Sequence, residues 1–271
     1  EVFEPITATR LGSYWNLVAP YAFASGYWSP EELAKIAGYM RRHGAFFLGM
    51  LRFNYYPTRI GACRRDGLPG YYTSGVDNVY LPAWLRVAAM IDAPELLRLS
   101  FYGYLAHGQT RGTFILGEGD TLGVYPGHYG RSTYGSVNNG NNTAFLMALR
   151  LLLLHEGCGR DGKPELLRFT PAVPPEWLEA GKEIAFDRVP TLFGPVSCRI
   201  RSLADPSRIE AEFTLPERLR PRRCQWRLPL PGGRRIAGIT PADIPWEEDT
   251  VDLTGQTGVV RLEVRLDESG R

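Results

Sequence analysis

The chain has few of the residues that build metal centres and disulfides. Its 271 residues include only four cysteines, four histidines and four methionines. The cysteines are widely spaced and form no CxxC pair, so the sequence predicts no zinc site and demands no disulfide. They are Cys63, Cys158, Cys198 and Cys224. We therefore expect free thiols in a reducing compartment, and neither a metal nor another cofactor.

The chain also lacks a long apolar run and an excess of charge. Its most apolar stretch, residues 144–154, includes Arg150 and is too short to span a bilayer. The net charge of +2 gives no reason to expect a nucleic acid or an anionic membrane as partner. The chain starts at Glu1, without a methionine or a signal-like stretch. We therefore expect a processed or truncated product and favour a cytoplasmic location.

The first half of the sequence has helical periodicity. Ser29-Pro30-Glu31-Glu32 is a typical helix start, and it predicts a helix over 30–43 with one apolar face. That face is formed by Leu33, Ile36, Ala37 and Met40. Further helices are expected over 79–91, from Asp92 through Tyr104, and over 142–155. The last is apolar on nearly all sides, which indicates a helix buried in a larger helical assembly.

The second half changes to a period of two. After Gly157 a proline-containing stretch, 164–175, is interpreted as a linker. Strands are then expected near 198–201, 209–213 and 259–264, separated by turn sequences such as Asp205-Pro206-Ser207. This spacing favours an antiparallel β-sandwich. We expect an α+β multidomain chain, with helical hairpins over 1–157 and a sandwich over 158–271.

The candidate site lies in the polar loops of the first half. Two long glycine-rich loops are expected over 107–125 and 128–142, with a shorter one over 71–78, and loops of this length are often functional. Their carboxylates, amides, arginine and aromatic rings suit sugar recognition. Glu118 lies between two glycines, so little bulk would block a ligand. The candidate binding residues are Asp77, His107, Arg111, Asp120, His128, Tyr129, Tyr134 and Asn139.

Each candidate has an alternative structural interpretation. Glu118 and Asp120 could be solvated acids of a turn. One of the asparagines in 138–142 could cap the following helix, because asparagine is a preferred cap. His107 and His128 could serve loop packing.

Several short motifs resemble one enzyme family. Thr113-Phe114-Ile115-Leu116-Gly117-Glu118 resembles the segment that ends in a catalytic glutamate, and Ser136-Val137-Asn138-Asn139 resembles a Ser-x-Asn-His motif. Leu192-Phe193-Gly194-Pro195-Val196 resembles the first hairpin of a trailing sandwich. In this order, over about 12–230, the features resemble the bacterial α-L-rhamnosidase-like branch of the six-hairpin glycosidases.

The resemblance implies a fold and a reaction. The fold would be the closing hairpins of an (α/α)6 toroid followed by a β-sandwich. Glu118 would be the general base of an inverting glycosidase, facing a carboxylic acid about 6.5–9.5 Å away. The candidate residues around it would bind an α-linked deoxy or neutral sugar or tune the base.

The sequence departs from the family at several points. Asn139 stands where a histidine is usual, Gly117 stands where a tryptophan is usual, and no segment matches the general acid. We therefore expect this chain alone to be inactive, with the missing half supplied by a partner chain, a second copy or another part of the gene product. The alternatives are a non-catalytic carbohydrate-binding or assembly module, or a structural module without a sugar site.

Overall fold

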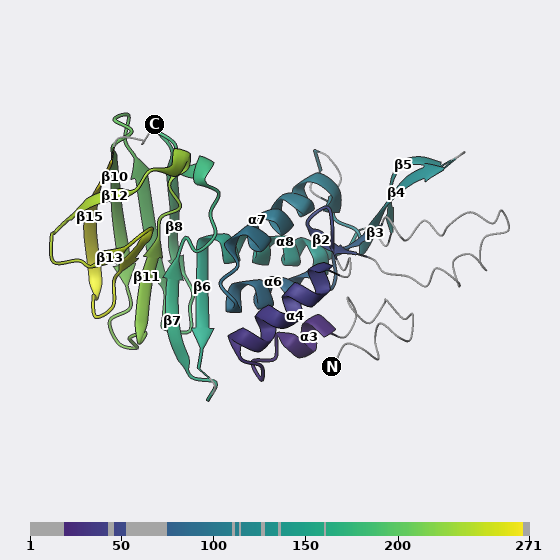
Figure 1. Ribbon diagram of the computed structural model, residues 1–271, viewed down its shortest axis with the longest axis horizontal. Helices are drawn as coiled ribbons and strands as arrows, with labels where there is room; N and C mark the ends of the chain where they lie inside the picture. The colour runs from purple at the N-terminus through teal and green to yellow at the C-terminus, as the bar shows by residue number, and fades with distance from the viewer. Residues whose placement is uncertain are drawn as a thin grey trace. The chain divides into compact units, whose positions relative to one another are not determined.

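The protein divides into two compact units, Glu1–Leu151 and Leu152–Arg271. The computed structural model describes residues 19–42, 46–52, 75–109, 112–113, 115–125, 128–134, 137–159 and 161–267 (Figure 1). The predicted division fell at 157/158, slightly later than the division in the structure. The two units contain helices and sheets, so the chain is α+β.

The helices described in the first unit are α3 (Ala19–Phe23), α4 (Pro30–Arg42), α6 (Leu81–Met90), α7 (Pro94–Gly103) and α8 (Asn139–Leu153). Helix α4 begins at Pro30 as the sequence predicts, and α6 and α7 each begin two residues after the predicted start. The start of α4 is closed by a reciprocal capping box: the Glu32 amide donates to Ser29 Oγ at 3.3 Å, and the Ser29 amide donates to Glu32 Oε2 at 2.9 Å. The predicted apolar face of α4 is buried, which confirms that part of the interpretation.

Helix α8 differs from its prediction. It begins at Asn139, three residues early, and it ends at Leu153. Ala144 and Ala148 are buried, but the side chain of Leu146 is 62% exposed. The expectation of burial on nearly all sides was therefore wrong, because one side of α8 faces solvent. Its inner side contacts α7 through the stacked rings of Phe145 and Phe101, whose centroids are 5.5 Å apart.

The predicted long loops of the first unit contain strands, and this is a correction. An antiparallel five-stranded sheet runs in the order β1-β2-β3-β4-β5. Its strands are β1 (Phe46–Phe47), β2 (Met50–Arg52), β3 (Gly75–Asp77), β4 (Gly119–Tyr125) and β5 (His128–Tyr134). Only Pro126 and Gly127 separate β4 from β5 in the sequence, and the two strands are rich in Tyr and Thr. That β propensity outweighs the glycines that suggested loops.

The described residues do not show a toroid. The regular elements described for the first unit are the helices named above, the π-helix η2 (Tyr104–Gly108) and the five-stranded sheet. Among the helices that the structure describes, none has both the length and the apolar character needed to cross a bilayer.

The second unit consists of two five-stranded sheets. One has the order β12-β15-β10-β9-β8 and the other β13-β14-β11-β7-β6. The second sheet is mixed, because β7 and β11 pair in parallel, so the expectation of a purely antiparallel sandwich was wrong. The bounds are β6 (Leu154–Cys158), β7 (Pro164–Phe169), β8 (Glu183–Val189), β9 (Val196–Ser202), β10 (Arg208–Leu215), β11 (Arg223–Arg227), β12 (Ile236–Thr240), β13 (Trp246–Glu247), β14 (Thr250–Asp252) and β15 (Gly258–Leu266).

One hydrophobic core joins the two sheets of the second unit. The ring of Phe213 on β10 lies 5.0 Å from that of Phe169 on β7 and 5.2 Å from that of Trp226 on β11. Burial in the same core raises the pKa of the Cys224 thiol to about 12, and it also raises the pKa of the Cys198 thiol. Both thiols therefore stay protonated and unreactive at neutral pH.

The stretch 164–175 was interpreted as a linker, and the structure places part of it in this core. Strand β7 buries Leu166, Leu167 and Phe169 between flanking prolines. Pro164 is tolerated because it is the first residue of the strand.

Candidate functional site

The backbone around Glu118 is held by hydrogen bonds from two other segments of the chain. The Leu116 amide donates to Asn142 Oδ1 at 3.2 Å, and the Leu116 carbonyl accepts from the Asn138 amide at 3.1 Å. The Glu118 carbonyl accepts from the Asn78 amide at 3.0 Å. Segments that are far apart in the sequence, at the end of β3 and the start of α8, therefore fix the residues that lead into β4.

Two buried side-chain amides converge on the carbonyl that precedes Glu118. The Gly117 oxygen accepts from Asn78 Nδ2 at 3.0 Å and from Asn141 Nδ2. The side chains of Asn78 and Asn141 are 0% and 2% exposed. Only the Nδ2 side of the Asn78 amide is bonded, because its buried Oδ1 has no hydrogen-bond partner. The two donated hydrogen bonds restrict the peptide that precedes Glu118.

The Glu118 carboxylate does not take part in this hydrogen-bond network of the described residues. Its side chain is half-buried, and within the described ranges it has no hydrogen-bond or ion-pair partner. A partly desolvated carboxylate without a partner costs free energy unless water or a ligand binds it. Fixed backbone and free oxygen atoms are what a carboxylate needs to accept a proton from a bound water or to bind hydroxyl groups.

Asn78 is the centre of the buried hydrogen-bond network. Its Nδ2 lies 3.2 Å from the Gly108 oxygen, 3.0 Å from the Gly117 oxygen and 3.1 Å from Asp120 Oδ2. The Tyr104 hydroxyl donates to the Asn78 carbonyl at 2.9 Å. Because three acceptors surround Nδ2, the amide cannot be reversed without placing Oδ1 against three oxygens.

The Asn78 oxygen faces a glycine on a π-helical turn. Helix α7 continues as the π-helix η2 (Tyr104–Gly108), a type of turn that is frequent at functional sites. A Cβ on Gly108 would lie 2.7 Å from Asn78 Oδ1 and 2.9 Å from Tyr104 Cδ1. The half-buried His107 precedes this glycine, so the close approach places His107 beside the network.

We expect Gly108→Ala to destabilise the first unit by about 1–3 kcal/mol, because the new methyl group forces the Asn78 amide or the Tyr104 ring to move. The free energy of unfolding from urea titration measures this. Gly38→Ala on α4 is the matched control, since its Cβ would lie 3.3 Å from the flexible end of Arg42. The control should be neutral or stabilising by up to about 1 kcal/mol. Equal stability of the two variants would contradict the packing described at Gly108.

The predicted residue Asp120 belongs to the support of the site. Its side chain is 2% exposed and accepts the hydrogen bond from Asn78 Nδ2. It therefore does not face solvent where a sugar would approach. His107 and Asn139 do reach the surface, half-buried and exposed respectively. The capping alternative is confirmed for Asn138, whose Oδ1 accepts from the Asn141 amide at 3.3 Å.

The strand register brings two other predicted residues near Glu118. Asp77 on β3 and Tyr134 on β5 are both the partners of Gly119, the residue after Glu118. Cα atoms of paired residues in antiparallel strands are about 4.5–5.5 Å apart. The backbones of Asp77 and Tyr134 therefore flank the start of β4, although their side chains lie outside the described residues.

The strand register does not bring the predicted residues His128 and Tyr129 to Glu118. His128 and Tyr129 lie at the other end of the β4–β5 hairpin, where His128 pairs with Tyr125. That end is six residues along β4 from Gly119, or about 20 Å. Their side chains, and Arg111 as a whole, lie outside the described residues.

Sequence reasoning missed the roles of Asn78 and Asn141. Both were recognised only as polar members of loops, and an asparagine beside a helix is usually a cap. Asn78 directly follows the short strand β3. That position could have indicated that its side chain reaches the ends of neighbouring strands.

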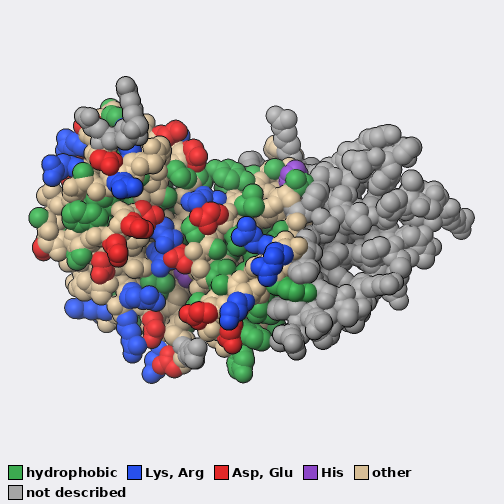
Figure 2. Space-filling model, viewed as in Figure 1, with side chains coloured by type: hydrophobic (Ala, Val, Ile, Leu, Met, Phe, Trp, Pro, Cys, Tyr) green, Lys and Arg blue, Asp and Glu red, His purple; other side chains and the backbone are tan. Residues whose placement is uncertain are grey.

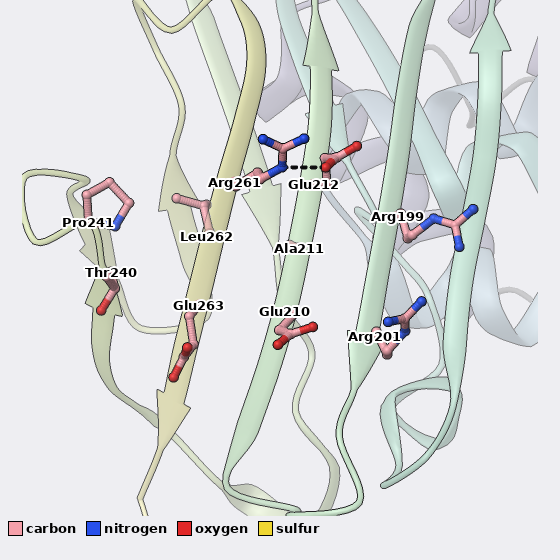
Figure 3. A pocket seen from close by; sticks show the side chains of 10 residues that line it. All are labelled: Arg199, Arg201, Glu210, Ala211, Glu212, Thr240, Pro241, Arg261, Leu262 and Glu263. Carbon is pink, nitrogen blue, oxygen red and sulfur yellow. Dashed lines mark hydrogen bonds and ion pairs between the residues drawn. The ribbon is translucent and has the colours of Figure 1, made fainter.

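A separate hollow of about 500 Å³ lies on one outer face of the sandwich (Figure 3). In it Arg261 donates to Glu212 at 2.7 Å, and the lining residues Arg199 and Arg201 both donate to Glu183 at 3.1 Å. Figure 2 shows charges of both signs interspersed over this unit. Exposed pairs of this kind contribute little, and they are typical of a solvated sheet face. No group of side chains suited to a metal ion occurs among the described residues.

Comparison with known proteins gives only distant structural similarity. No protein-family model and no curated protein matches the chain. Among solved structures, Ara127N, a GH127 beta-L-arabinofuranosidase from Geobacillus stearothermophilus T6, aligns with a TM-score of 0.34 and 12% identity. The alignment covers 71% of this chain and 32% of that enzyme, so the chain spans about a third of its length. A similarity this low establishes neither a shared fold nor a shared activity.

Proposed function

We propose that this chain carries the general-base side of a glycoside hydrolase site, in the C-terminal part of a six-hairpin-type enzyme. The observation that supports this most is the contrast between the side chain and the backbone of Glu118. Its carboxylate has no partner within the described ranges, while the backbone on both sides of it is fixed by buried asparagines. The sequence motif that ends at Glu118 supports the same role.

In the proposed reaction, Glu118 accepts a proton from a water that attacks the anomeric carbon. The C–O bond to the leaving group breaks as the new C–O bond forms, and a carboxylic acid protonates the departing oxygen. The configuration at the anomeric carbon is inverted. We propose that this acid comes from outside the 271 residues, with Asp77 as a sugar ligand beside the base.

The sugar would be bound by side chains that surround the start of β4. His107 and Asn139 reach the surface of the described part, and the backbones of Asp77 and Tyr134 flank Glu118. Arg111 remains a proposed contact, whereas His128 and Tyr129 lie at the far end of the β4–β5 pair and are not proposed to touch this sugar. Asp120 supports the site by accepting a hydrogen bond from Asn78, and it is not proposed to touch the sugar.

The isolated chain and a preparation completed with the missing part should be compared on aryl glycosides. The completed preparation is expected to release the phenol, and proton NMR of the fresh product should show the inverted anomer. The isolated chain is expected to bind but not to turn over. Full turnover by the isolated chain would contradict the external acid, and a retained anomer would contradict the inverting mechanism.

Exposed apolar side chains on α7 and its extension support a missing partner. Leu99 is 55% exposed, Tyr102 44% and Leu105 37%, at successive turns. Apolar groups gathered on one surface favour association. We propose that further helical hairpins, from a partner chain or the same gene product, cover them. Sedimentation of the isolated chain as a stable monomer at high micromolar concentration would argue against this.

A second candidate function is a non-catalytic carbohydrate-binding or assembly module. Gly117 and Asn139 stand where the resembled family has tryptophan and histidine. These differences favour a chain that has lost catalysis but still binds a sugar. Calorimetric binding of a sugar without any hydrolysis by the completed preparation would favour this alternative over the enzyme.

A further inference from the structure

We infer that Asn78 is a positioning residue that joins the π-helical turn carrying His107 to the strand start carrying Glu118. His107 directly precedes Gly108, and Glu118 directly follows Gly117. The carbonyl oxygens of both glycines lie within hydrogen-bonding distance of Asn78 Nδ2, at 3.2 and 3.0 Å, and share its two N–H groups with Asp120 Oδ2. Two oxygens bound to one nitrogen at these distances lie at most about 6 Å apart. One amide therefore links two side chains that are eleven positions apart in sequence.

The link uses both the side chain and the backbone of Asn78. Its amide N–H binds the Glu118 carbonyl at 3.0 Å, and its own carbonyl accepts from the Tyr104 hydroxyl at 2.9 Å. Tyr104 is the first residue of the π-helix and Gly108 is the last. Asn78 thus contacts the turn at both of its ends and β4 at its start, so neither segment can shift alone.

The carbonyl of Gly108 is one of the helix-end acceptors that have no partner within the helix. Asn78 supplies that partner from another segment. Its oxygen cannot exchange places with Nδ2, because Asp120 and both glycine carbonyls would then face a fourth oxygen. The orientation of the Asn78 side-chain amide is consequently fixed by its hydrogen-bond acceptors as well as by its burial.

Asn141 provides a matched comparison. It donates to the same Gly117 oxygen and is almost as buried as Asn78. Its backbone amide bonds to Asn138, at the start of its own helix. Loss of the Asn141 side chain should therefore loosen the Glu118 segment without affecting the π-helical turn.

Amide hydrogen exchange followed by NMR tests the link without any assay of activity. Asn78→Ala is expected to speed exchange by about 10-fold or more at both 105–109 and 116–120. Asn141→Ala should speed it at 116–120 alone. Amides of α4 and β10 are the references, and they should be unchanged in both variants.

Three results would overturn the inference. The first is unchanged exchange at 105–109 in Asn78→Ala. The second is equal loosening of that turn by Asn141→Ala. The third is uniform acceleration that includes α4, since that would mean a general loss of stability.

The consequence for catalysis rests on the proposed function. In the completed preparation, Asn78→Ala should lower kcat by about 100-fold and change KM by less than about 3-fold, because orientation and not binding is lost. An unchanged kcat would reject the positioning role while leaving Glu118 as base. No turnover even by the native preparation would reject the proposed function, and the exchange result would still decide the link.

Discussion

Glu118→Gln is expected to lower turnover by about 10²–10⁴-fold in the completed preparation, with sugar binding spared. Glutamine has nearly the same shape and can still hydrogen-bond a hydroxyl, but it cannot accept the proton of the attacking water. The backbone bonds of Glu118 involve its carbonyl and its neighbours, so they are untouched by the change. Initial rates on an aryl glycoside and calorimetry with the same sugar give the two quantities.

Glu95→Gln is the matched control for Glu118→Gln. Glu95 lies in the same unit, at the first turn of α7, and its exposed carboxylate is 3.7 Å from Arg98. Loss of such a pair changes stability by less than about 1 kcal/mol and should leave turnover unchanged. If Glu118→Gln keeps the native rate, Glu118 is not the base. If it abolishes sugar binding as well, its role is in binding the substrate.

Asn78→Asp is expected to destabilise the first unit by about 3–5 kcal/mol, enough to unfold it in many proteins of this size. The change replaces the Nδ2 donor by an oxygen that faces the carbonyls of Gly108 and Gly117 and the carboxylate of Asp120. Asn78 is fully buried, so water cannot relieve the repulsion. Urea unfolding followed by NMR, with signals of the second unit read separately, measures the loss.

Asn138→Asp controls for the chemical change itself. The Asn138 oxygen accepts from the Asn141 amide at the start of α8, and aspartate caps a helix equally well. Its effect should stay within about 0.5 kcal/mol. A first unit that unfolds at the same urea concentration in both variants would contradict the donor role assigned to Asn78.

The helices of the first unit could be predicted because their signals are local. Ser29 and Glu32 are close in sequence and close the start of α4 by themselves. The alternation near 209–213 likewise predicted a strand, and β10 buries every second residue there. Such patterns need no knowledge of distant segments.

The β4–β5 hairpin and the mixed sheet could not be predicted in the same way. Glycines at 119, 123 and 130 suggested loops, and only pairing with a neighbouring strand decides whether such a segment is extended. The parallel pairing of β7 with β11 joins segments more than fifty residues apart, and proline at 164 and 171 concealed the strand.

The candidate site was predicted in part. Glu118 was chosen for its flanking glycines and its motif, and the structure leaves its carboxylate available within the described residues. The clamp of Asn78 and Asn141 depends on the tertiary placement of β3, η2 and α8, which no spacing in the sequence reveals.

The most direct test asks whether the sugar site lies at Glu118. The isotope-labelled chain is titrated with methyl α-L-rhamnoside and other neutral or deoxy glycosides, and the amide NMR shifts are followed. The largest shifts are expected at 116–120 and at Asn139, at the start of α8. Shifts centred on the outer sandwich face between Arg199 and Glu263, or no saturable shift with any sugar, would contradict a site built around Glu118.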